Sequence, residues 1–358
     1  MPDRRRHVPA NGDLAAVFRD FAHRRCDRYA PLYAQLGAGI AGDPDLLTLA
    51  ANAAPGQSAP DLMLAAVHYL LASEPGHPLA CHYPTLADSP ISGGAFPLFR
   101  HFCMQRRSQL TQLIGTRYVQ TNEVRRCCYL LPAVMLAAQL AGRPLALIEP
   151  GTSAGLNLTL DSYAYDYGPG LSFGEPAAPL ILRCRLRGHQ RLPPNLVMPR
   201  IGWRAGIDLH PLQPTDPADA AWLRALVWAD HRERAALLDS ALTVAAAAPA
   251  IPVHAGEAAE VLPRLVTTAP AELAVCIFHT AFLAHLPRLD RQRFEHLIAV
   301  LSAVRPIYWV QAEPLPDPAD PRLRLTICQD GQITGRWPLG HYHPHGAWLE
   351  WLAGTSCG

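Results

Sequence analysis

A carboxylate followed by a turn of small residues is the feature of this sequence best suited to chemistry. An apolar run that begins at Leu145 ends at Glu149, and Gly151, Ser153 and Gly155 follow before a helical pattern resumes. This order predicts a buried strand, a tight loop and a helix. Glycines let a backbone take positive φ and approach a ligand, and the helix is expected to offer unpaired N–H groups. The Glu149 carboxylate could accept hydrogen bonds from a ligand amine or hydroxyl.

The spacing of this turn differs from the dinucleotide-binding fingerprint Gly-x-Gly-x-x-Gly. Ser153 stands where a middle glycine is expected, and the last interval does not fit. An ordinary strand-to-helix turn with incidental glycines is the competing interpretation, because a single glycine motif often occurs without function. The motif therefore needs support from the other strand ends.

Strands and helices alternate from Leu145 onward, which predicts a mostly parallel sheet covered by helices. Ligands bind such sheets at the carboxyl ends of the strands. The expected strand ends are Glu149, Asp208, Gly256, His279 and Glu313. The interval from Glu149 to Asp208 is much longer than the usual spacing of about 20 residues. An insertion over about 167–199 is expected to account for the excess.

The two halves of the chain differ in pattern. Helical periodicity without strand-like alternation predicts an all-helical domain or cap over residues 1–118. Residues 119–358 are expected to form the α/β domain. Near its end, apolar runs on either side of Asp330 and Gly331 predict a terminal antiparallel hairpin.

Polar residues precede the helix that leads into the first strand. In one interpretation, Gln120, Asn122 and Arg126 face the turn at Glu149 and bind a substrate, and Arg126 holds a carboxylate through two hydrogen bonds. In the other, Asn122 is the N-cap of the following helix. The two interpretations are compatible.

Three side chains are candidates for a general base. His279, at the end of the fourth expected strand, comes first because imidazole titrates near neutral pH. Tyr163 and Glu313 are secondary candidates. A buried structural histidine is the competing interpretation of His279.

The composition excludes several enzyme classes. All 31 residues in the combined lysine and arginine count are arginine. The absence of lysine excludes Schiff-base chemistry, pyridoxal phosphate anchoring and the lysine of a P-loop. A formal net charge of +1 gives no global attraction for nucleic acid or anionic membranes, so a small-molecule substrate is expected.

The nine cysteines are scattered without a Cys-x-x-Cys pair. The sequence also carries no recognisable secretory signal and no long uninterrupted apolar stretch. These features predict a cytoplasmic protein with free thiols.

Several motifs resemble the signatures of an uncharacterised bacterial family, a domain of unknown function. They are residues 120–123, 149–157, 161–168, 206–211, 222–228 and 345–346. The resemblance covers nearly the whole chain and implies a common fold, but it does not name a reaction.

The strand ends also resemble those of class I S-adenosylmethionine-dependent methyltransferases, which have a Rossmann-like α/β fold. By this resemblance, Glu149, Gly151, Ser153, Gly155 and Asn157 would hold the methionine portion and ribose, Asp208 the ribose hydroxyls, and Gly256 with Glu257 the adenine edge. The chain departs from the methyltransferase pattern at Ser153, at Pro150 and in the long interval to the second strand. The resemblance implies S-adenosylmethionine as cofactor and methyl transfer to a small molecule.

Two alternatives belong to other functional classes. His341, His343 and His345 alternate, so in an extended segment they would share one face and could bind zinc in a metal-dependent hydrolase. Pro344 and Gly346 favour a loop instead. The other alternative is a non-catalytic ligand-binding protein on a methyltransferase-like fold, because fold does not determine function.

Overall fold

The computed structural model describes residues 13–313 and 322–352, and these form two compact units. Unit 1 contains the described residues up to 121 together with 216–239. Unit 2 contains 122–215 and the described residues from 240 onward. The two units are described separately.

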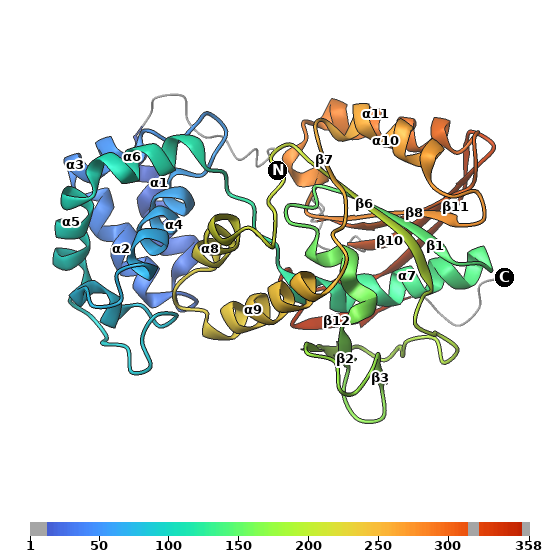
Figure 1. The fold of residues 1–358 in the computed structure, drawn as a ribbon, viewed down its shortest axis with the longest axis horizontal. Coiled ribbons are helices and arrows are strands. Elements are labelled where there is room, and N and C mark those ends of the chain that lie inside the picture. The colour runs from blue at the N-terminus through green and yellow to red at the C-terminus, as the bar shows by residue number, and fades with distance from the viewer. Residues whose placement is uncertain (1–12, 314–321, 353–358) are drawn as a thin grey trace. The chain divides into compact units, whose positions relative to one another are not determined.

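Unit 1 is helical. Its elements are α1 (Leu14–Asp20), the π-helix η1 (Phe21–Cys26), α2 (Pro31–Ala41), α3 (Pro44–Ala50), α4 (Ala59–Ala72), the 3₁₀ helix η2 (Pro78–His82), α5 (Ala95–Gln105), α6 (Arg107–Thr116), α8 (Pro217–Leu226) and the first part of α9 (Arg232–Ala247). Proline in the first turn starts α2, α3 and α4, where its missing N–H costs nothing. Figure 1 shows these helices in blue and cyan, with α8 and α9 in yellow.

The segment 216–239 packs with the N-terminal helices, although it lies within residues 119–358, which were expected to form the α/β domain. Asp230 accepts hydrogen bonds from the backbone N–H groups of Leu32 and Tyr33 at the start of α2. Trp222 donates its indole N–H to the carbonyl oxygen of Tyr118 at 3.0 Å. These partners are more than 100 residues away along the chain, so local patterns could not reveal them.

Unit 2 is built on a nine-stranded, largely parallel sheet with the strand order β5-β12-β11-β10-β9-β8-β1-β6-β7. The strands are β1 (Leu145–Pro150), β5 (Arg185–Arg187), β6 (Ile201–Asp208), β7 (Val253–Ala255), β8 (Ala274–Thr280), β9 (Ile307–Ala312), β10 (Leu323–Gln329), β11 (Gln332–Tyr342) and β12 (Trp348–Trp351). The run from β7 through β9 is entirely parallel. The predicted α/β class with a largely parallel sheet is therefore confirmed.

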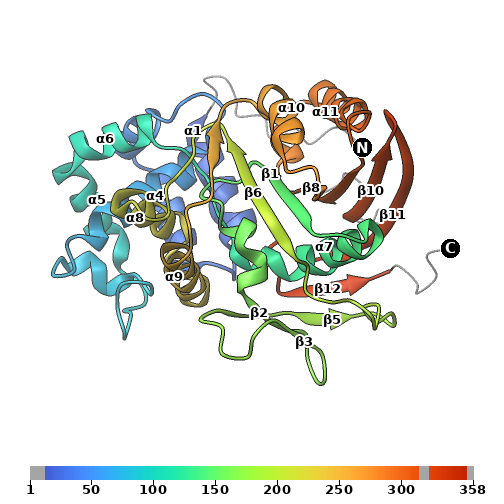
Figure 2. The ribbon, with the colours of Figure 1, turned by 45° about the vertical axis from the view of Figure 1, so that its right-hand side comes forward.

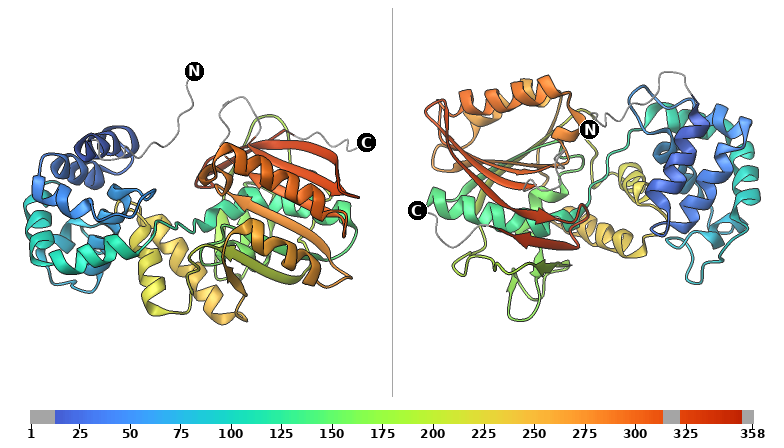
Figure 3. Two further views of the ribbon diagram at one scale, coloured as in Figure 1. Left: turned by 90° about the horizontal axis from the view of Figure 1, so that it is seen from above. Right: turned by 180° about the vertical axis from the view of Figure 1, so that it is seen from behind.

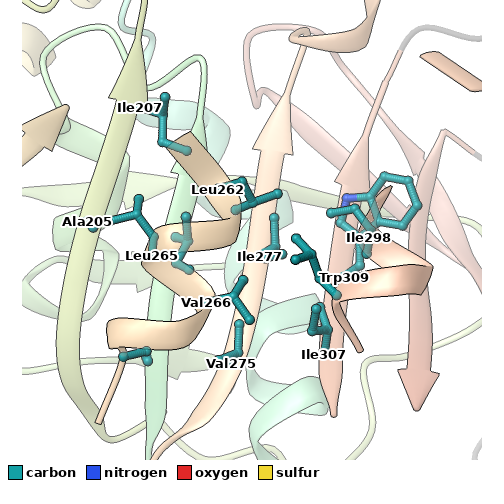
Figure 4. Packing of buried hydrophobic residues seen from close by; sticks show 14 of the residues in the cluster. Ala205, Ile207, Leu262, Leu265, Val266, Val275, Ile277, Ile298, Ile307 and Trp309 are labelled. Carbon is teal, nitrogen blue, oxygen red and sulfur yellow. The ribbon is translucent and has the colours of Figure 1, made fainter. Parts of the chain in front are cut away.

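Helices cover both faces of this sheet. Alternate side chains of the strands, such as Ile148, Ile277 and Trp309, pack with α10 (Ala258–Thr268) and α11 (Arg288–Leu301) in one apolar core, which Figure 4 shows from close by. The other face is covered by α7 (Cys127–Ala141), preceded by the 3₁₀ turn η3 (Val124–Arg126). Figure 3 shows α11 and α7 on opposite sides of the sheet.

The stretch from Val124 to Ala141 is the one candidate membrane span found among the described residues, by length and hydropathy alone. Within the protein, 67% of this span is buried. Its apolar composition is accounted for by packing, because a helix that is hydrophobic on all sides is typical of a protein core.

The terminal hairpin forms as predicted. Strand β10 pairs antiparallel with both β9 and β11. Asp330 and Gly331 connect β10 to β11 with φ of 52° and 77°. Positive φ at both central residues is the requirement of a type I′ turn, whose twist matches that of the flanking strands.

The predicted insertion, about residues 167–199, contains several short strands. The run 180–186 divides at Cys184 into β4 (Ile181–Arg183) and β5, which enter different sheets. β4 joins β2 (Ala164–Asp166) and β3 (Ser172–Phe173) in a small three-stranded sheet, whereas β5 pairs with β12 (Figure 2).

Candidate functional site

The glycine turn, residues 151–155, follows the central strand of the parallel run. In the sheet, β1 lies between β6 and β8. The chain forms β6 on one side of β1 and later crosses over to form β8 on the other side. The carboxyl end of β1 is thus a topological switch point, where open α/β sheets have a crevice that binds ligands. We call the glycine turn together with Glu149, Asn157, Asp208 and Asn122 the strand-end site.

Alternate residues of the glycine turn have left-handed backbone conformations. Gly151, Ser153 and Gly155 have φ of 72°, 56° and 75°. Ser153 therefore adopts the conformation that a middle glycine would adopt, at a cost of about 1–2 kcal/mol for a residue with a side chain. The Ser153 N–H donates to Oδ2 of Asp208 at 2.8 Å, which helps to hold this conformation.

The N–H groups of the glycine turn form hydrogen bonds within the protein. The sequence pattern had predicted unpaired N–H groups that a ligand could use. Asn122 Oδ1 accepts from the N–H groups of Ala154 and Leu156, both at 3.2 Å. The N–H groups of Gly151 and Thr152 donate to the Ile207 carbonyl oxygen. The following element, η4 (Leu156–Ser162), is a 3₁₀ helix of seven residues instead of a regular α-helix. Residues 152–155 are buried and their N–H groups already have acceptors, so the turn does not provide a set of free N–H groups for a phosphate.

Glu149 is almost fully buried, with 1% of its surface exposed. Its Oε2 accepts from the Thr152 hydroxyl at 2.5 Å, and its Oε1 accepts from Nδ2 of Asn157 at 2.9 Å. Burial raises the pKa of Glu149 to about 8, even though these two hydrogen bonds oppose the rise. Glu149 is consequently mostly protonated at neutral pH, a property found in acids at functional sites.

Gly206 makes room for the glycine turn. A Cβ atom at this position of β6 would lie 2.5 Å from Cγ2 of Thr152. A glycine inside a strand pattern marks such a close approach. Gly206 is therefore the residue whose type could have indicated that Thr152, which was not a predicted site residue, packs against β6.

We expect the Gly206→Ala variant to unfold with a free energy about 1–3 kcal/mol lower than that of the wild type, because a displaced Thr152 would lose its hydrogen bond to Glu149. Urea denaturation measures this difference. Gly115→Ala is the matched control, because the nearest atom to its Cβ lies 3.6 Å away. Equal stability of Gly206→Ala and the wild type would show that Thr152 moves without cost.

Asp208 lies at the end of β6, beside the glycine turn. Its Oδ1 accepts from the His210 N–H at 3.0 Å, in addition to the Ser153 hydrogen bond at Oδ2. The Gly256 N–H donates to the Asp208 carbonyl oxygen, which brings the end of β7 to the same edge. Glu257 precedes α10 with an exposed side chain. The structure thus brings Asp208 and Gly256 together with the glycine turn.

His279 does not join the strand-end site. Successive side chains of β8 alternate between the two faces, and His279 lies with Phe282, Phe294 and Trp309 on the face covered by α11. Its Nδ1 is 2.7 Å from Oε1 of Glu313, and its Nε2 accepts from the Trp309 indole N–H at 2.9 Å. With no exposed surface and both ring nitrogens occupied, His279 has no lone pair for a substrate proton. The general-base assignment is therefore corrected to a structural role.

Glu313 and Tyr163, the secondary candidates for a general base, also have structural roles. Glu313 also accepts from the N–H groups of Phe282 and Ala284, so it fixes the loop after β8. The Tyr163 hydroxyl is buried and donates to the Leu156 carbonyl oxygen at 2.7 Å. Burial raises the pKa of Tyr163 well above its ordinary value, which opposes the ionised form that a base requires.

The three predicted substrate-binding residues are divided between the two units. Gln120 belongs to unit 1, whereas Asn122 and Arg126 belong to unit 2. Asn122 is buried and holds the glycine turn through its side-chain oxygen, so its observed contact is structural. Arg126 is half-buried and donates from Nε to the Pro344 carbonyl oxygen at 3.3 Å.

Two tyrosines and a threonine that were not predicted as site residues lie on the α7 side of the sheet. The hydroxyl oxygen of Tyr129 is 2.8 Å from Oγ1 of Thr280, the last residue of β8. The rings of Tyr129 and Tyr342 are stacked with their centroids 4.0 Å apart. Thr280 thus points to the face of the sheet that α7 covers, whereas His279 points to the opposite face.

The histidines of the metal-binding alternative do not form a site. His341 lies in β11 opposite Glu350, and His345 Nδ1 is 3.4 Å from Oε2 of Glu123. Within residues 13–313 and 322–352, no group of three or more His, Cys, Asp or Glu side chains is placed to hold a metal ion. The geometry therefore gives the metal-dependent hydrolase no support.

Comparison with known proteins agrees with the predicted family. No curated protein and no solved structure matches the chain. A family model described as an uncharacterised protein conserved in bacteria (DUF2332) matches residues 15–351, which span both units. The chain therefore belongs to this family of uncharacterised bacterial proteins.

Proposed function

We propose that the chain is an S-adenosylmethionine-dependent methyltransferase that acts on a small molecule and binds its cofactor at the strand-end site. The observation that carries the proposal is the position of the glycine turn in the sheet. Numbered in chain order, the parallel strands β7, β6, β1, β8 and β9 lie in the order 3-2-1-4-5. This is the strand order of Rossmann-like nucleotide-binding sheets, in which the ligand binds after the first strand.

The hydrogen bonds of the glycine turn favour a nucleoside ligand without phosphate over a dinucleotide ligand. Dinucleotides need free N–H groups at a helix N-terminus for their pyrophosphate. Here the N–H groups of Ala154 and Leu156 are already bonded to Asn122. S-adenosylmethionine carries no phosphate, so its ribose needs only a close backbone and an acid such as Asp208.

The residues present fit the cofactor at two further points. Gly151 is exposed and carries no side chain, and the Asp208 carboxylate at the end of β6 is partly exposed, so that a ribose could reach it. Bound there, the cofactor would supply an activated methyl group, and the protein would contribute mainly its alignment with the substrate.

Calorimetric titration of the full-length protein with S-adenosylhomocysteine tests the proposal. We expect a Kd on the order of micromolar for the wild type, and an affinity at least about tenfold weaker for Asp208→Asn, because the amide loses the anionic acceptor. Asp290→Asn, on α11, is the matched control and should bind like the wild type. A folded wild-type protein that does not bind would refute the proposal.

Gly151 is a poor position for this test. Its φ of 72° disfavours any side chain, and a Cβ atom would lie 2.9 Å from Phe282. An arginine introduced there would strain the fold and obscure a loss of binding.

A further inference from the structure

A small pocket lies in unit 2 where the three neighbouring strands β9, β10 and β11 face α11. Its volume is about 240 Å³, and its lining includes Glu295 of α11, Gln311 of β9, Arg324 and Thr326 of β10, and Arg336 of β11. The helix α11 packs against both β10 and β11 (Figure 2). In the sheet, β8 and β9 separate β10 from β1, so this pocket is distinct from the strand-end site. We call it the β10 pocket.

The register of the strands brings four polar side chains to one face of the sheet. Trp309 belongs to the apolar core under α11, and Gln311 follows it by two residues, so both point to this face. Arg324 lies directly opposite Gln311, and Thr326 lies directly opposite Trp309. Arg336 of β11 lies opposite Thr326. Directly opposite residues share a face, with Cβ atoms about 4.5–5.5 Å apart, so these polar side chains arise from one small area.

The most buried of these polar groups is the hydroxyl of Thr326, which is 3% exposed. Its Oγ1 accepts from Nε2 of Gln311 at 3.0 Å. A hydroxyl that accepts a hydrogen bond still has its own hydrogen to donate. Two residues further along β10, Cys328 belongs to the apolar core, so the change from apolar to polar side chains coincides with the pocket.

The lining carries one positive charge in excess, because it includes two guanidinium groups and one carboxylate. Glu295 accepts from Nη2 of Arg336, and these side chains are 40% and 59% exposed. A guanidinium group has five N–H donors, so one ion pair leaves donors of Arg336 for a second acceptor. A pocket with an excess of positive charge attracts anions.

We propose that the β10 pocket binds a phosphate group, either as inorganic phosphate or on a small phosphate monoester. Arg324 and Arg336 come from adjacent strands, and the Thr326 hydroxyl lies at the base of both, so the donors approach from several directions. A planar carboxylate is matched by a single guanidinium fork, whereas the oxygens of a tetrahedral phosphate can accept from several sides. Binding there does not depend on the proposed methyltransferase function.

The volume of the pocket limits the size of the ligand. A volume of 240 Å³ corresponds to about eight water molecules at about 30 Å³ each. Pockets for drug-sized ligands have volumes of about 300–1,000 Å³. The β10 pocket therefore suits a phosphate with a body of a few carbon atoms, and not a nucleotide.

Calorimetric titration of the full-length protein at constant ionic strength tests the proposal, with inorganic phosphate, glycerol 3-phosphate and acetate as probes. We expect a Kd below about 1 mM for at least one phosphate compound, and acetate should bind at least about tenfold more weakly because it has fewer acceptor oxygens. Tighter binding of glycerol 3-phosphate than of phosphate would assign the site to a monoester, and the reverse order to the free ion. If neither phosphate compound binds to folded protein, or if acetate binds as tightly, the proposal is wrong.

Variants of two arginines that form similar ion pairs locate the binding. Arg336→Gln should weaken the affinity for the phosphate compound about tenfold, because charge-assisted hydrogen bonds are lost. Arg293→Gln is the matched control and should bind like the wild type, since Arg293 forms an exposed ion pair with Asp290 on α11 and does not line the pocket. Exposed ion pairs contribute little to stability, so both variants are expected to fold.

Unchanged affinity in Arg336→Gln would place the phosphate elsewhere and overturn the assignment. Arg324→Gln is a second variant of the lining and should also weaken binding about tenfold. The assignment can therefore be tested even if one of the two variants does not fold.

Discussion

Replacing Asn122 with alanine is expected to destabilise unit 2 by about 2–4 kcal/mol and to abolish the binding of S-adenosylhomocysteine proposed for the strand-end site. The side-chain oxygen of Asn122 is the acceptor for the N–H groups of Ala154 and Leu156, and both donors are buried. Each buried N–H left without a partner costs about 1–3 kcal/mol. The glycine turn would also lose the contact that joins it to the segment before α7.

Urea denaturation and titration with S-adenosylhomocysteine measure the two effects. Asn122→Asp is the matched control, since a carboxylate oxygen of the same reach can accept both hydrogen bonds, and it should retain more stability and binding than the alanine variant. If Asn122→Ala unfolds within about 0.5 kcal/mol of the wild type, as surface variants do, Asn122 does not hold the turn.

The buried carboxyl group of Glu149 is expected to make the wild-type protein less stable as pH rises. Burial raises the pKa of Glu149 from 4.5 to about 8 in the folded protein. The unfolded chain loses this proton near pH 4.5 and the folded protein near pH 8, so the folded state binds more protons between these values. The stabilisation is complete below pH 4.5 and is lost as pH rises toward 8, by up to about 1.4 kcal/mol per pH unit.

The Glu149→Gln variant should lack this contribution to the pH dependence. A glutamine side chain can accept from Asn157 and donate to Thr152, so it mimics the protonated acid without titrating. The measurement is the free energy of unfolding in urea at several pH values between 5 and 8. Glu260→Gln, an exposed position in α10, is the matched control and should follow the wild type. Parallel pH curves for the wild type and Glu149→Gln would contradict the prediction.

Local patterns in the sequence were enough to predict the class of the fold and most elements of unit 2. The apolar run before Glu149 is β1, the run before His279 lies in β8, and the Asp330–Gly331 dipeptide forms the hairpin turn. These features are determined by neighbours within a few residues, through side-chain burial and allowed φ angles. The family was also predicted from short segments of the sequence, and the family model that matches residues 15–351 confirms it.

Local patterns in the sequence did not indicate which side chains at the strand ends lie close to one another. Every residue of β1 is buried, as are the first six of β8, because helices cover both faces of the sheet. Such strands show no alternation of apolar and polar residues, so the sequence does not indicate which side chain lies on which face. His279 was therefore grouped with Glu149 although it points to the α11 face, and Thr280 was overlooked.

The sequence by itself determined that a strand, a tight turn of small residues and a short helical segment follow one another around Glu149. Only the tertiary structure decided which acceptors the N–H groups of this turn meet. Its N–H groups are satisfied by Asn122, 32 residues before Ala154, and by Asp208, 55 residues after Ser153. Buried donors must find acceptors wherever the fold supplies them, and the distance along the chain to such an acceptor is set by packing, which local periodicity does not encode.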